Sequence, residues 1–391
     1  MRNPDISRRS VLSMMMLGGG AVLLSSCGDN SASAPEGTAA PQGTPAPSST
    51  SALAQTIRLT DQRGKTLTFD RPVSRVVTIP MPAASLLVAV DQSADHLSGM
   101  HNASWLAMRD GTMGKLFPKA LTVPHDIATT DFTPNVESIR ALNPDVVVQW
   151  SDSQLTGPLE NAGLKVLGLT NTGQQSDVDA WVTLFSEMLG KPERATAIKS
   201  RSELELTKIR ALAAGRSGPG PRILYFNRFT GGLKVAANGS YNDFYIKLVG
   251  GSNPATAGTG VKGSGMVGVD VEQVLAWNPE VVLLGNFDGA LPQDIYSDPV
   301  WQNVSAVRER RVYKVPLGGY RWDPPGQESP LMWQWLTDIS FPSQKSSALR
   351  GAIPDYYRFL YGQAPDSAEI DTILWMSVNS KSADYEQFRG A

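Results

Sequence analysis

The clearest pattern of apolar and polar positions in the chain occurs twice. Residues 136–148 read VESIRALNPDVVV and residues 271–283 read VEQVLAWNPEVVL, and the two segments align without a gap. In each copy, apolar residues at helical spacing lead to Asn-Pro, where a helix should end because proline disfavours the α conformation of the residue before it. The apolar run that follows is typical of a strand buried on both faces of a parallel sheet. Two copies are too few for a solenoid, so they predict two similar halves.

The rest of the pattern extends this picture. Residues 57–69 alternate apolar and polar positions around Arg63-Gly64, which predicts a β-hairpin. Residues 75–79 and 222–226 are short β-branched and aromatic runs that predict the first strand of each half. From Pro192 to Gly215 the helical period is uninterrupted, and such a helix is about 33 Å long, enough to connect two lobes. The predicted fold class is therefore α/β, with two Rossmann-like lobes joined by a single long α-helix and a ligand cleft between the lobes.

The first residues read as an export signal rather than as part of the fold. Arg8 and Arg9 precede a weakly hydrophobic run, as in a twin-arginine signal peptide. Leu24-Ser25-Ser26-Cys27 resembles a lipobox, so Cys27 is the expected lipidation site, although an ordinary secretory signal with an incidental cysteine is the alternative. Cys27 is the only cysteine, which excludes an intrachain disulfide. The apolar run is too short for a membrane span, which needs about 20 residues.

Composition supports a division of the chain into several parts. The segment after Cys27 is rich in Ser, Ala, Pro, Thr and Gly and should be a disordered tether. The length of 391 residues and the hydrophobic content of 41% suit two cores, and a net charge of −2 argues against nucleic acid as a partner. The expected parts are a signal peptide (1–27), a tether (28–55), an N-terminal lobe (56–190), an interlobe helix (191–216) and a C-terminal lobe (217–391).

Several segments, in order, resemble the substrate-binding proteins of ABC importers for siderophores, cobalamin and haem. The resemblance rests on both copies of the repeat, on the opening DQRGKTLTF and RPVSRVVTI, and on the closing segment 356–374. It implies a receptor in the periplasm or at the cell surface that binds a metal chelate and delivers it to an ABC permease dimer with its ATPase. An iron–siderophore complex is the first expectation, with cobalamin, haem or a molybdate-type oxyanion as alternatives. It also implies a monomer that touches the membrane only through the lipid, without catalytic residues, cofactor or resident metal.

The loops that follow strands should carry the ligand-binding residues, because ligands of such lobes lie at the carboxyl ends of the strands. The loop Tyr320-Arg321-Trp322 is the first candidate, since an arginine beside two aromatic rings can stack on a flat ligand and pair with its negative charge. The structural alternative is that Trp322 covers the core while Arg321 pairs with Glu328. Weaker candidates in other loops are Trp105, Phe132, Trp150, Arg228 and Tyr241.

Glu137 and Glu272 occupy matched positions in the two copies of the repeat. In the family that this chain resembles, the corresponding glutamates dock with permease arginines, one from each lobe. An isolated exposed pair contributes only about 0–1 kcal/mol, but two such contacts on one body also fix its orientation. The alternative is that both are solvated helix residues.

An extracytoplasmic enzyme or a metallochaperone is the alternative from another class. The sequence has no serine elbow, P-loop or zinc-protease motif, and residues 258–263 match G-x-G-x-x-G without the preceding strand that a dinucleotide site requires, which favours a plain loop. Three histidines, His96, His101 and His125, have no cysteine partner. Direct capture of a transition metal by His101 and His125 stays open as a minor alternative.

Overall fold

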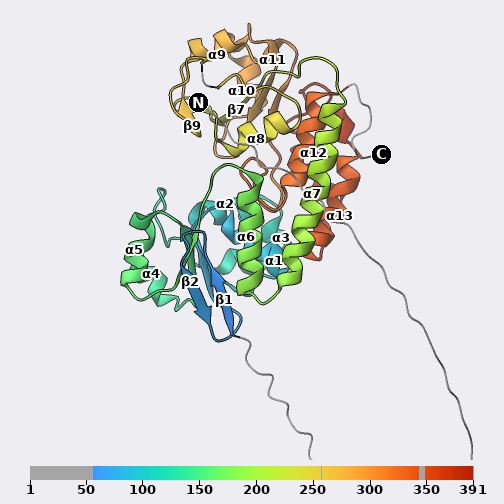
Figure 1. The fold of residues 1–391 in the computed structure, drawn as a ribbon. Helices are drawn as coiled ribbons and strands as arrows, with labels where there is room; N and C mark the ends of the chain where they lie inside the picture. Colours follow the sequence, from blue (N-terminus) through green and yellow to red (C-terminus); the bar gives the residue numbers. More distant parts are fainter. Residues whose placement is uncertain (1–55, 257, 343–347, 391) are drawn as a thin grey trace, which may run out of the picture. The chain divides into compact units, whose positions relative to one another are not determined.

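The computed structural model of the chain describes residues 56–256, 258–342 and 348–390 (Figure 1). All of them lie within one contact-defined unit, Leu53–Ala391. The predicted signal peptide, the lipidation site Cys27 and the tether up to residue 55 lie outside the described residues. In the part of the chain that is described, no helix is both long enough and apolar enough to cross a membrane.

The N-terminal lobe is built on a four-stranded parallel sheet with strand order β4-β3-β5-β6. Its strands are β3 (Val76–Thr78), β4 (Leu97–Met100), β5 (Val146–Trp150) and β6 (Val166–Leu169). The two central strands, β3 and β5, are buried on both faces over most of their length, as the valine-rich runs predict. The helices of this lobe are α1 (Ala83–Asp91), α2 (Asn102–Asp110), α3 (Met113–Leu116), η1 (Pro118–Thr122), α4 (Val136–Ala141), α5 (Ser153–Asn161) and α6 (Gln175–Met188).

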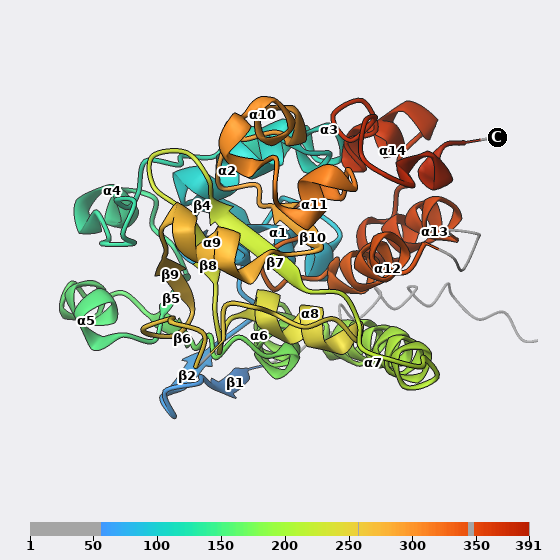
Figure 2. The same cartoon turned by 90° about the horizontal axis from the view of Figure 1, so that it is seen from above.

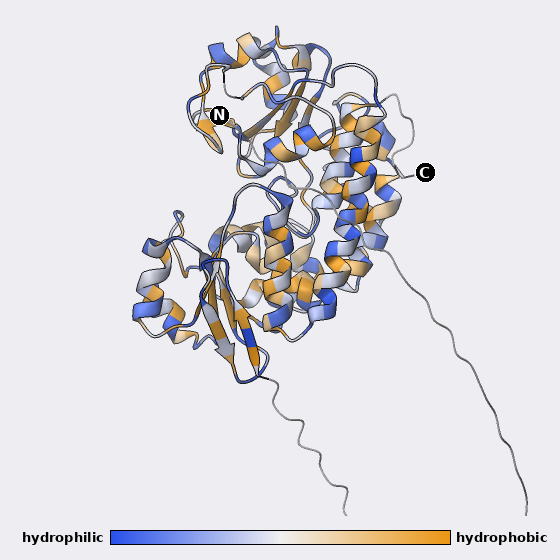
Figure 3. Ribbon diagram, viewed as in Figure 1, coloured by the Kyte–Doolittle hydropathy of each residue, from blue (hydrophilic) through white to orange (hydrophobic). Residues whose placement is uncertain are grey.

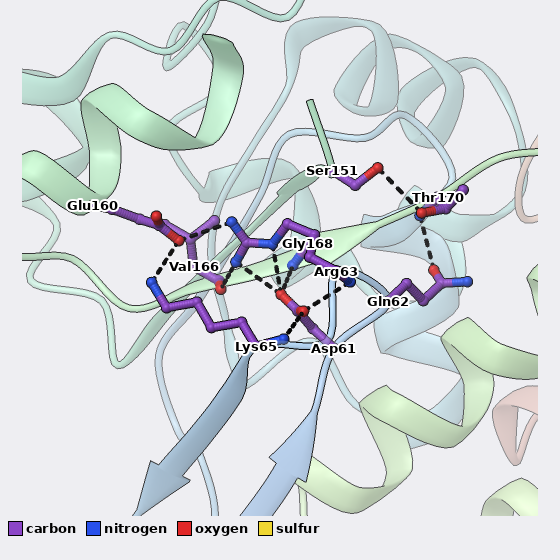
Figure 4. A network of polar contacts seen from close by, with 9 residues as sticks. All are labelled: Asp61, Gln62, Arg63, Lys65, Ser151, Glu160, Val166, Gly168 and Thr170. Carbon is purple, nitrogen blue, oxygen red and sulfur yellow. Dashed lines mark hydrogen bonds and ion pairs between the residues drawn. The ribbon is translucent and has the colours of Figure 1, made fainter. Parts of the chain in front are cut away.

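The predicted hairpin, β1 (Ile57–Thr60) and β2 (Thr66–Phe69), is present, and its turn is fixed to the edge of this sheet. Figure 4 shows the polar network: the buried carboxylate of Asp61 accepts hydrogen bonds from the backbone N–H groups of Arg63 and Gly168, both at 2.9 Å. Arg63 forms an ion pair with Glu160 at 2.8 Å. The hairpin therefore holds the end of β6 in place.

The C-terminal lobe has a five-stranded mixed sheet with order β11-β10-β7-β8-β9. Strands β7 (Ile223–Arg228), β10 (Val281–Leu284) and β11 (Val312–Lys314) are parallel, and β8 (Lys234–Ala236) pairs antiparallel with both β7 and β9 (Met266–Gly268). Strands β8 and β9 were not predicted, because each is short and lies between glycine-rich segments that interrupt the apolar pattern. The helices of this lobe are α8 (Tyr241–Leu248), α9 (Val271–Trp277), α10 (Pro292–Ser297), η2 (Pro299–Trp301) and α11 (Ser305–Arg308).

The predicted helix–turn–strand unit occurs in both lobes with the same geometry. Helix α4 and helix α9 both end before Asn-Pro, and the two asparagines have left-handed backbones, with φ of 46° at Asn143 and 44° at Asn278. The residue after each proline donates its backbone N–H to the arginine that precedes the central strand, at 2.8 Å in both lobes. The prediction of two similar halves is confirmed.

Helix α7 (Pro192–Ala214) is a single helix of 23 residues, as the uninterrupted period predicts. It packs on α6 and on α12 (Ser329–Ser340), while α13 (Leu349–Tyr361) packs on α1 of the N-terminal lobe (Figures 1 and 2). Arg194 of α7 donates to the carbonyls of Ala89 and Leu360, which joins these elements. The chain ends with α14 (Ser367–Ile373) and η3 (Tyr385–Phe388).

The hydrophobic core is shared at this junction and separate elsewhere. One large cluster contains residues of both lobes, such as Leu86 of α1 and Trp333 of α12, whereas each lobe also has a smaller cluster of its own on the far face of its sheet. Figure 3 shows the apolar strands of both sheets and the mixed apolar and polar stripes of the helices. The lobes are thus connected by packed side chains as well as by α7.

Candidate functional site: a cavity between the lobes

A cavity of about 510 Å³ is lined by residues of both lobes. From the N-terminal lobe it is lined by Met81, Thr130, Phe132, Asn171 and Gly173. From the C-terminal lobe the side chains that the cavity contacts include Tyr225, Asn227, Arg228, Tyr241, Asn242, Met266, Phe287, Asp323, Pro324 and Pro325. Several of these directly follow, or end, parallel strands, which is where α/β sheets bind ligands.

A buried carboxylate forms part of the wall. Asp323 is fully buried, and its Oδ2 accepts hydrogen bonds from the Tyr225 hydroxyl at 2.6 Å and from the Asn286 backbone N–H at 3.1 Å. Burial, together with the neighbouring Asp323, raises the pKa of Tyr225 well above its ordinary value, so the hydroxyl keeps the proton that it donates. The Oδ2 atom of Asp323 is therefore hydrogen-bonded to groups of the protein itself.

The N-terminus of α8 opens onto the cavity. Ser240 caps the helix by accepting the N–H of Asp243 at 3.1 Å, while the backbone N–H groups of Tyr241 and Asn242 have no acceptor among the described residues. Free N–H groups at a helix N-terminus favour an anion. The Tyr241 hydroxyl donates to Gln175 of α6 at 2.8 Å, and burial raises the pKa of Tyr241, so this contact between the lobes is retained at neutral pH.

Three of the residues predicted to bind the ligand line the cavity: Phe132, Arg228 and Tyr241. Arg228 is exposed and has no ion-pair partner in the described part of the chain, so its charge is available to a ligand. The ring of Phe132 is half-buried and lies 5.2 Å from the His101 ring and 6.2 Å from the Trp150 ring.

The loop that was the first candidate is placed differently. Tyr320 and Trp322 are each 1% exposed and do not line the cavity. Arg321 donates to the carbonyl of Ala103 in the N-terminal lobe at 3.0 Å and to that of Asn286 in the C-terminal lobe at 3.1 Å, and it stacks on Phe287, a residue of the cavity wall. Arg321 thus bridges the lobes beside the cavity.

The structural alternative for this loop is correct for Trp322 and wrong for Arg321. Trp322 does lie in the core, but Glu328 pairs with Trp322 rather than with Arg321: the Trp322 indole donates to its carboxylate at 2.6 Å, and the hydroxyls of Tyr357 and Tyr361 donate as well. The expected pairing of Arg321 with Glu328 is wrong because three neutral donors already surround the buried carboxylate.

Two further candidates, Trp105 and Trp150, do not line the cavity. Trp105 donates its indole N–H to Leu121 at 3.0 Å and stacks on His125, with ring centroids 4.3 Å apart. Trp150 packs edge-on between Phe132 and Trp181. Neither ring is part of the cavity lining.

The histidines do not form a metal site. His101 is buried, its Nδ1 accepts the N–H of Ala103 at 3.0 Å, and its Nε2 lies 2.9 Å from the Thr129 carbonyl, so both ring nitrogens are engaged. Burial lowers the pKa of His101, which favours this neutral form. No group of three or more His, Cys, Asp or Glu residues suited to a metal ion occurs among the described residues.

Comparisons with known proteins identify the family. A family described as periplasmic binding protein matches residues 128–317. A periplasmic solute-binding protein from Veillonella parvula is 30% identical, and its crystal structure matches 83% of this chain and 99% of its own with a TM-score of 0.75. The chain belongs to the periplasmic binding protein family.

More distant relatives share the fold of this binding protein. The molybdate-binding protein MolA of Haemophilus influenzae is 23% identical over 338 residues, which cover 79% of this chain and 93% of MolA. The structure of MolA with molybdate gives a TM-score of 0.68 over 79% of this chain and 99% of MolA, at 21% identity. The CeuE structure of Helicobacter pylori with Ni-His also gives 0.68, at 18% identity, covering 82% and 100% of the two chains. MolA is described as the cognate periplasmic binding protein of an ABC transporter.

Some cavity residues of this binding protein escaped the sequence analysis. Asn171 follows β6 and Phe287 follows β10, so the strand-end rule applied to those two strands would have found both. Asn242 and Met266 carry no such signal, because they reach the cavity from a helix and from an unpredicted strand.

The two glutamates of the repeat are exposed in the first turns of α4 and α9. Asn135 and Asp270 cap these helices by accepting the N–H groups of Ser138 and Gln273. Neither Glu137 nor Glu272 pairs with another residue in the described ranges. Both carboxylates are therefore free to contact another molecule.

Proposed function

We propose that the protein is an extracytoplasmic lipoprotein receptor that captures an iron–siderophore complex, or a related anionic metal chelate, and delivers it to an ABC permease. The observation that carries this proposal is the cavity of about 510 Å³ between the lobes, lined by aromatic residues and by the exposed cation Arg228. A cavity of this size suits a ligand of many atoms rather than a bare tetrahedral oxyanion. Arginine beside aromatic rings can hold a planar, negatively charged ligand by stacking and pairing.

A molybdate-type oxyanion is the second candidate. It is favoured by the likeness to MolA, described as a molybdate-binding protein, and by the two free N–H groups at the N-terminus of α8. These groups could hold an oxyanion as helix N-termini hold phosphate or sulfate. Cobalamin and haem belong to the same class of transported ligand and enter the same test.

The test is a tryptophan-fluorescence titration of the purified protein with ferric enterobactin, ferrioxamine B, haem, cyanocobalamin and sodium molybdate. The expected result is saturable quenching by a ferric siderophore at micromolar concentration or below, without a response to molybdate. Iron-free enterobactin is the control for binding of the organic ligand alone. A response to molybdate alone would replace the first candidate with the second, and turnover of any compound without tight binding would favour an enzyme and contradict both.

Anchoring by a lipid on Cys27 is part of the proposal and rests on the lipobox-like sequence. Cys27→Ala should move the protein from the membrane fraction to the soluble extracytoplasmic fraction, whereas Arg8→Lys with Arg9→Lys should leave it in the cytoplasm. Immunoblots of cell fractions report both outcomes. A Cys27→Ala protein that stays with the membrane would contradict the anchor while leaving the proposed ligand untouched.

A further inference from the structure

Phe132 is the last residue of a tight turn that lines the cavity. Ala128 and Pro134 pair as an antiparallel bridge, and the chain between them reverses. The N–H of Phe132 donates to the Thr129 carbonyl at 3.0 Å, and the N–H of Thr129 donates to Thr133 at 3.0 Å. Phe132 ends this turn with a left-handed backbone, φ 68°.

A left-handed residue after such a turn is normally glycine, because a side chain at this φ meets its own backbone. Seven described residues other than glycine have positive φ, and two of them are the asparagines of the repeat, a residue type that tolerates this conformation. Of the seven, Phe132 alone lines the cavity. A bulky residue thus occupies a strained position at the ligand site.

The surroundings hold this backbone in place. Gln149 is fully buried, donates its amide to the Phe132 carbonyl at 3.0 Å, and accepts the N–H of Trp150 at 2.7 Å. Asp131 braces the turn by accepting from the Thr129 hydroxyl and from the N–H of Thr133. Strained residues persist only where neighbouring contacts fix them, and they concentrate at functional sites.

The ring of Phe132 supplies apolar surface from the N-terminal lobe, and the C-terminal lobe supplies Phe287, Pro324 and Pro325 to the same cavity. Apolar surfaces from both lobes suit a ligand with a flat unsaturated face, such as a catecholate ring or a porphyrin. A bare oxyanion, or a chelate built only of hydroxamates and methylene chains, offers no ring to stack on Phe132.

We propose that Phe132 is a specificity-determining residue, held at a strained backbone because the ligand presents a flat unsaturated face to it. This inference rests on the proposed function and narrows its ligand class.

The experiment compares Phe132→Ala, Phe132→Gly and Phe132→Tyr with the wild-type protein, using ferric enterobactin, haem, ferrioxamine B and molybdate as probes. Phe132→Ala and Phe132→Gly should both weaken the binding of ferric enterobactin or haem, whichever the wild type binds, by about tenfold, because both variants remove the ring. Phe132→Tyr should keep the affinity within about threefold, since it preserves the stacking face. Any binding of ferrioxamine B should change little.

Thermal unfolding provides the readout for strain. Phe132→Gly should melt about 1–3 °C above Phe132→Ala, because only glycine relieves the left-handed backbone. Gln92 is the matched control: it is exposed, has φ of 57°, and lies at the end of α1 away from the cavity. Gln92→Gly should likewise melt above Gln92→Ala, and neither should alter ligand affinity.

The contrary results are distinct. Unchanged affinity in Phe132→Ala, with a lowered Tm, would show that Phe132 only packs in the fold and does not contact the ligand. Equal Tm values for the Ala and Gly variants would show that the backbone at residue 132 is not strained. A wild-type protein that binds only molybdate or ferrioxamine B would overturn this inference but preserve a receptor function. A wild-type protein that binds none of the four probes, and no cyanocobalamin either, would remove the proposed function and this inference together.

Discussion

Asp288 holds the backbone next to Arg228, although Asp288 is not itself part of the cavity lining. Its carboxylate accepts the N–H groups of Phe229 and Ala290 at 2.7 Å and of Thr230 at 2.8 Å. Burial alone would raise the pKa of Asp288, but these backbone hydrogen bonds hold it below its ordinary value. The loop that contains Asp288 is also fixed by buried Lys314, which donates to the carbonyls of Gly285, Asp288 and Ala290.

We expect Asp288 to act on the ligand through Arg228. Arg228→Gln should weaken the binding of ferric enterobactin about fivefold to tenfold, because it removes one charge-assisted contact. Asp288→Asn should weaken it less, and the double variant should lose no more than Arg228→Gln alone, because residues that act through one contact are not additive. Fluorescence titration of the three variants checks this. Asp294→Asn, which removes an exposed cap of α10, is the control, and additive losses would show that Asp288 acts independently.

Glu328 should make the stability of the protein depend on pH. Burial raises its pKa above the ordinary value of 4.5, although Tyr361, Trp322 and Tyr357 donate to the carboxylate. The folded protein therefore keeps the Glu328 proton to higher pH than the unfolded chain does. The contribution of protonated Glu328 to the free energy of unfolding is full below about pH 4.5 and is lost as the pH rises through the raised pKa. The unfolding free energy of the wild type minus that of Glu328→Gln should fall as pH rises from 4.5 to 8 in urea titrations. A constant difference would contradict the raised pKa.

These residues show what the sequence could and could not reveal about the site. Phe132, Arg228 and Tyr241 were found because they lie beside strand ends or helix starts that the apolar pattern predicts. The roles of Asp288 and Lys314 depend on hydrogen bonds across the C-terminal lobe, so Lys314 within Val-Tyr-Lys-Val gives no sign of being buried. The interior position of Trp322 has the same cause: Tyr357 and Tyr361 of α13 complete its surroundings from a distant segment.

The repeated unit places equivalent helices at equivalent points of the two lobes. An arginine before the central strand reaches the last turn of the helix in each: Arg75 donates to the Asn143 carbonyl at 2.9 Å, and Arg222 donates to that of Asn278 at 3.0 Å. Cations at helix C-termini stabilise the free carbonyls there. Each glutamate therefore projects from a helix whose two ends are both fixed.

We predict that Glu137→Ala together with Glu272→Ala abolishes uptake of the transported ligand and leaves its affinity unchanged. The physical reason is that two separate ion pairs fix the orientation of the receptor on a permease, although each alone is weak. Transport by cells and titration of the purified variant check the two halves of the prediction. Glu187→Ala with Glu203→Ala, also exposed, is the control, and normal uptake by the repeat variant would refute docking.

Element prediction succeeded where a pattern was long or occurred twice. The period of α7 and the two Asn-Pro segments located a helix and two helix–strand units because each spans enough residues to fix its own phase. Strand β8 pairs with both β7 and β9, and this pairing depends on segments distant in the sequence, whereas the glycine-flanked residues of β8 and β9 show no apolar run of their own. Their absence from the prediction left the C-terminal sheet incomplete at the edge that carries Met266.

The two lobes touch at several points around the cavity besides α7. Tyr241 bonds to Gln175, Arg321 bonds to Ala103, and the N–H of Thr112 donates to Gly318 at 2.9 Å. Next to the first of these contacts, Gly173 approaches Gly239 so closely that a Cβ at Gly173 would lie 2.5 Å from the Gly239 carbonyl oxygen. Such contacts, with the shared core behind them, predict modest closure on ligand binding rather than a wide hinge motion.

Gly173→Ala tests whether this contact between the lobes sets the shape of the cavity. Gly173 has φ of 76°, and Gly163 has φ of 80° with open space around it, so alanine at either position carries a similar backbone cost of about 1 kcal/mol. Only at position 173 must the facing backbone of the other lobe also move. Gly173→Ala should therefore unfold at lower urea concentration than Gly163→Ala and weaken ferric enterobactin several-fold, whereas Gly163→Ala should bind normally. Equal stability and equal ligand affinity of the two variants would mean that the contact between Gly173 and Gly239 does not affect ligand binding. The packing of α7 would then be left as the structural feature that limits closure of the lobes.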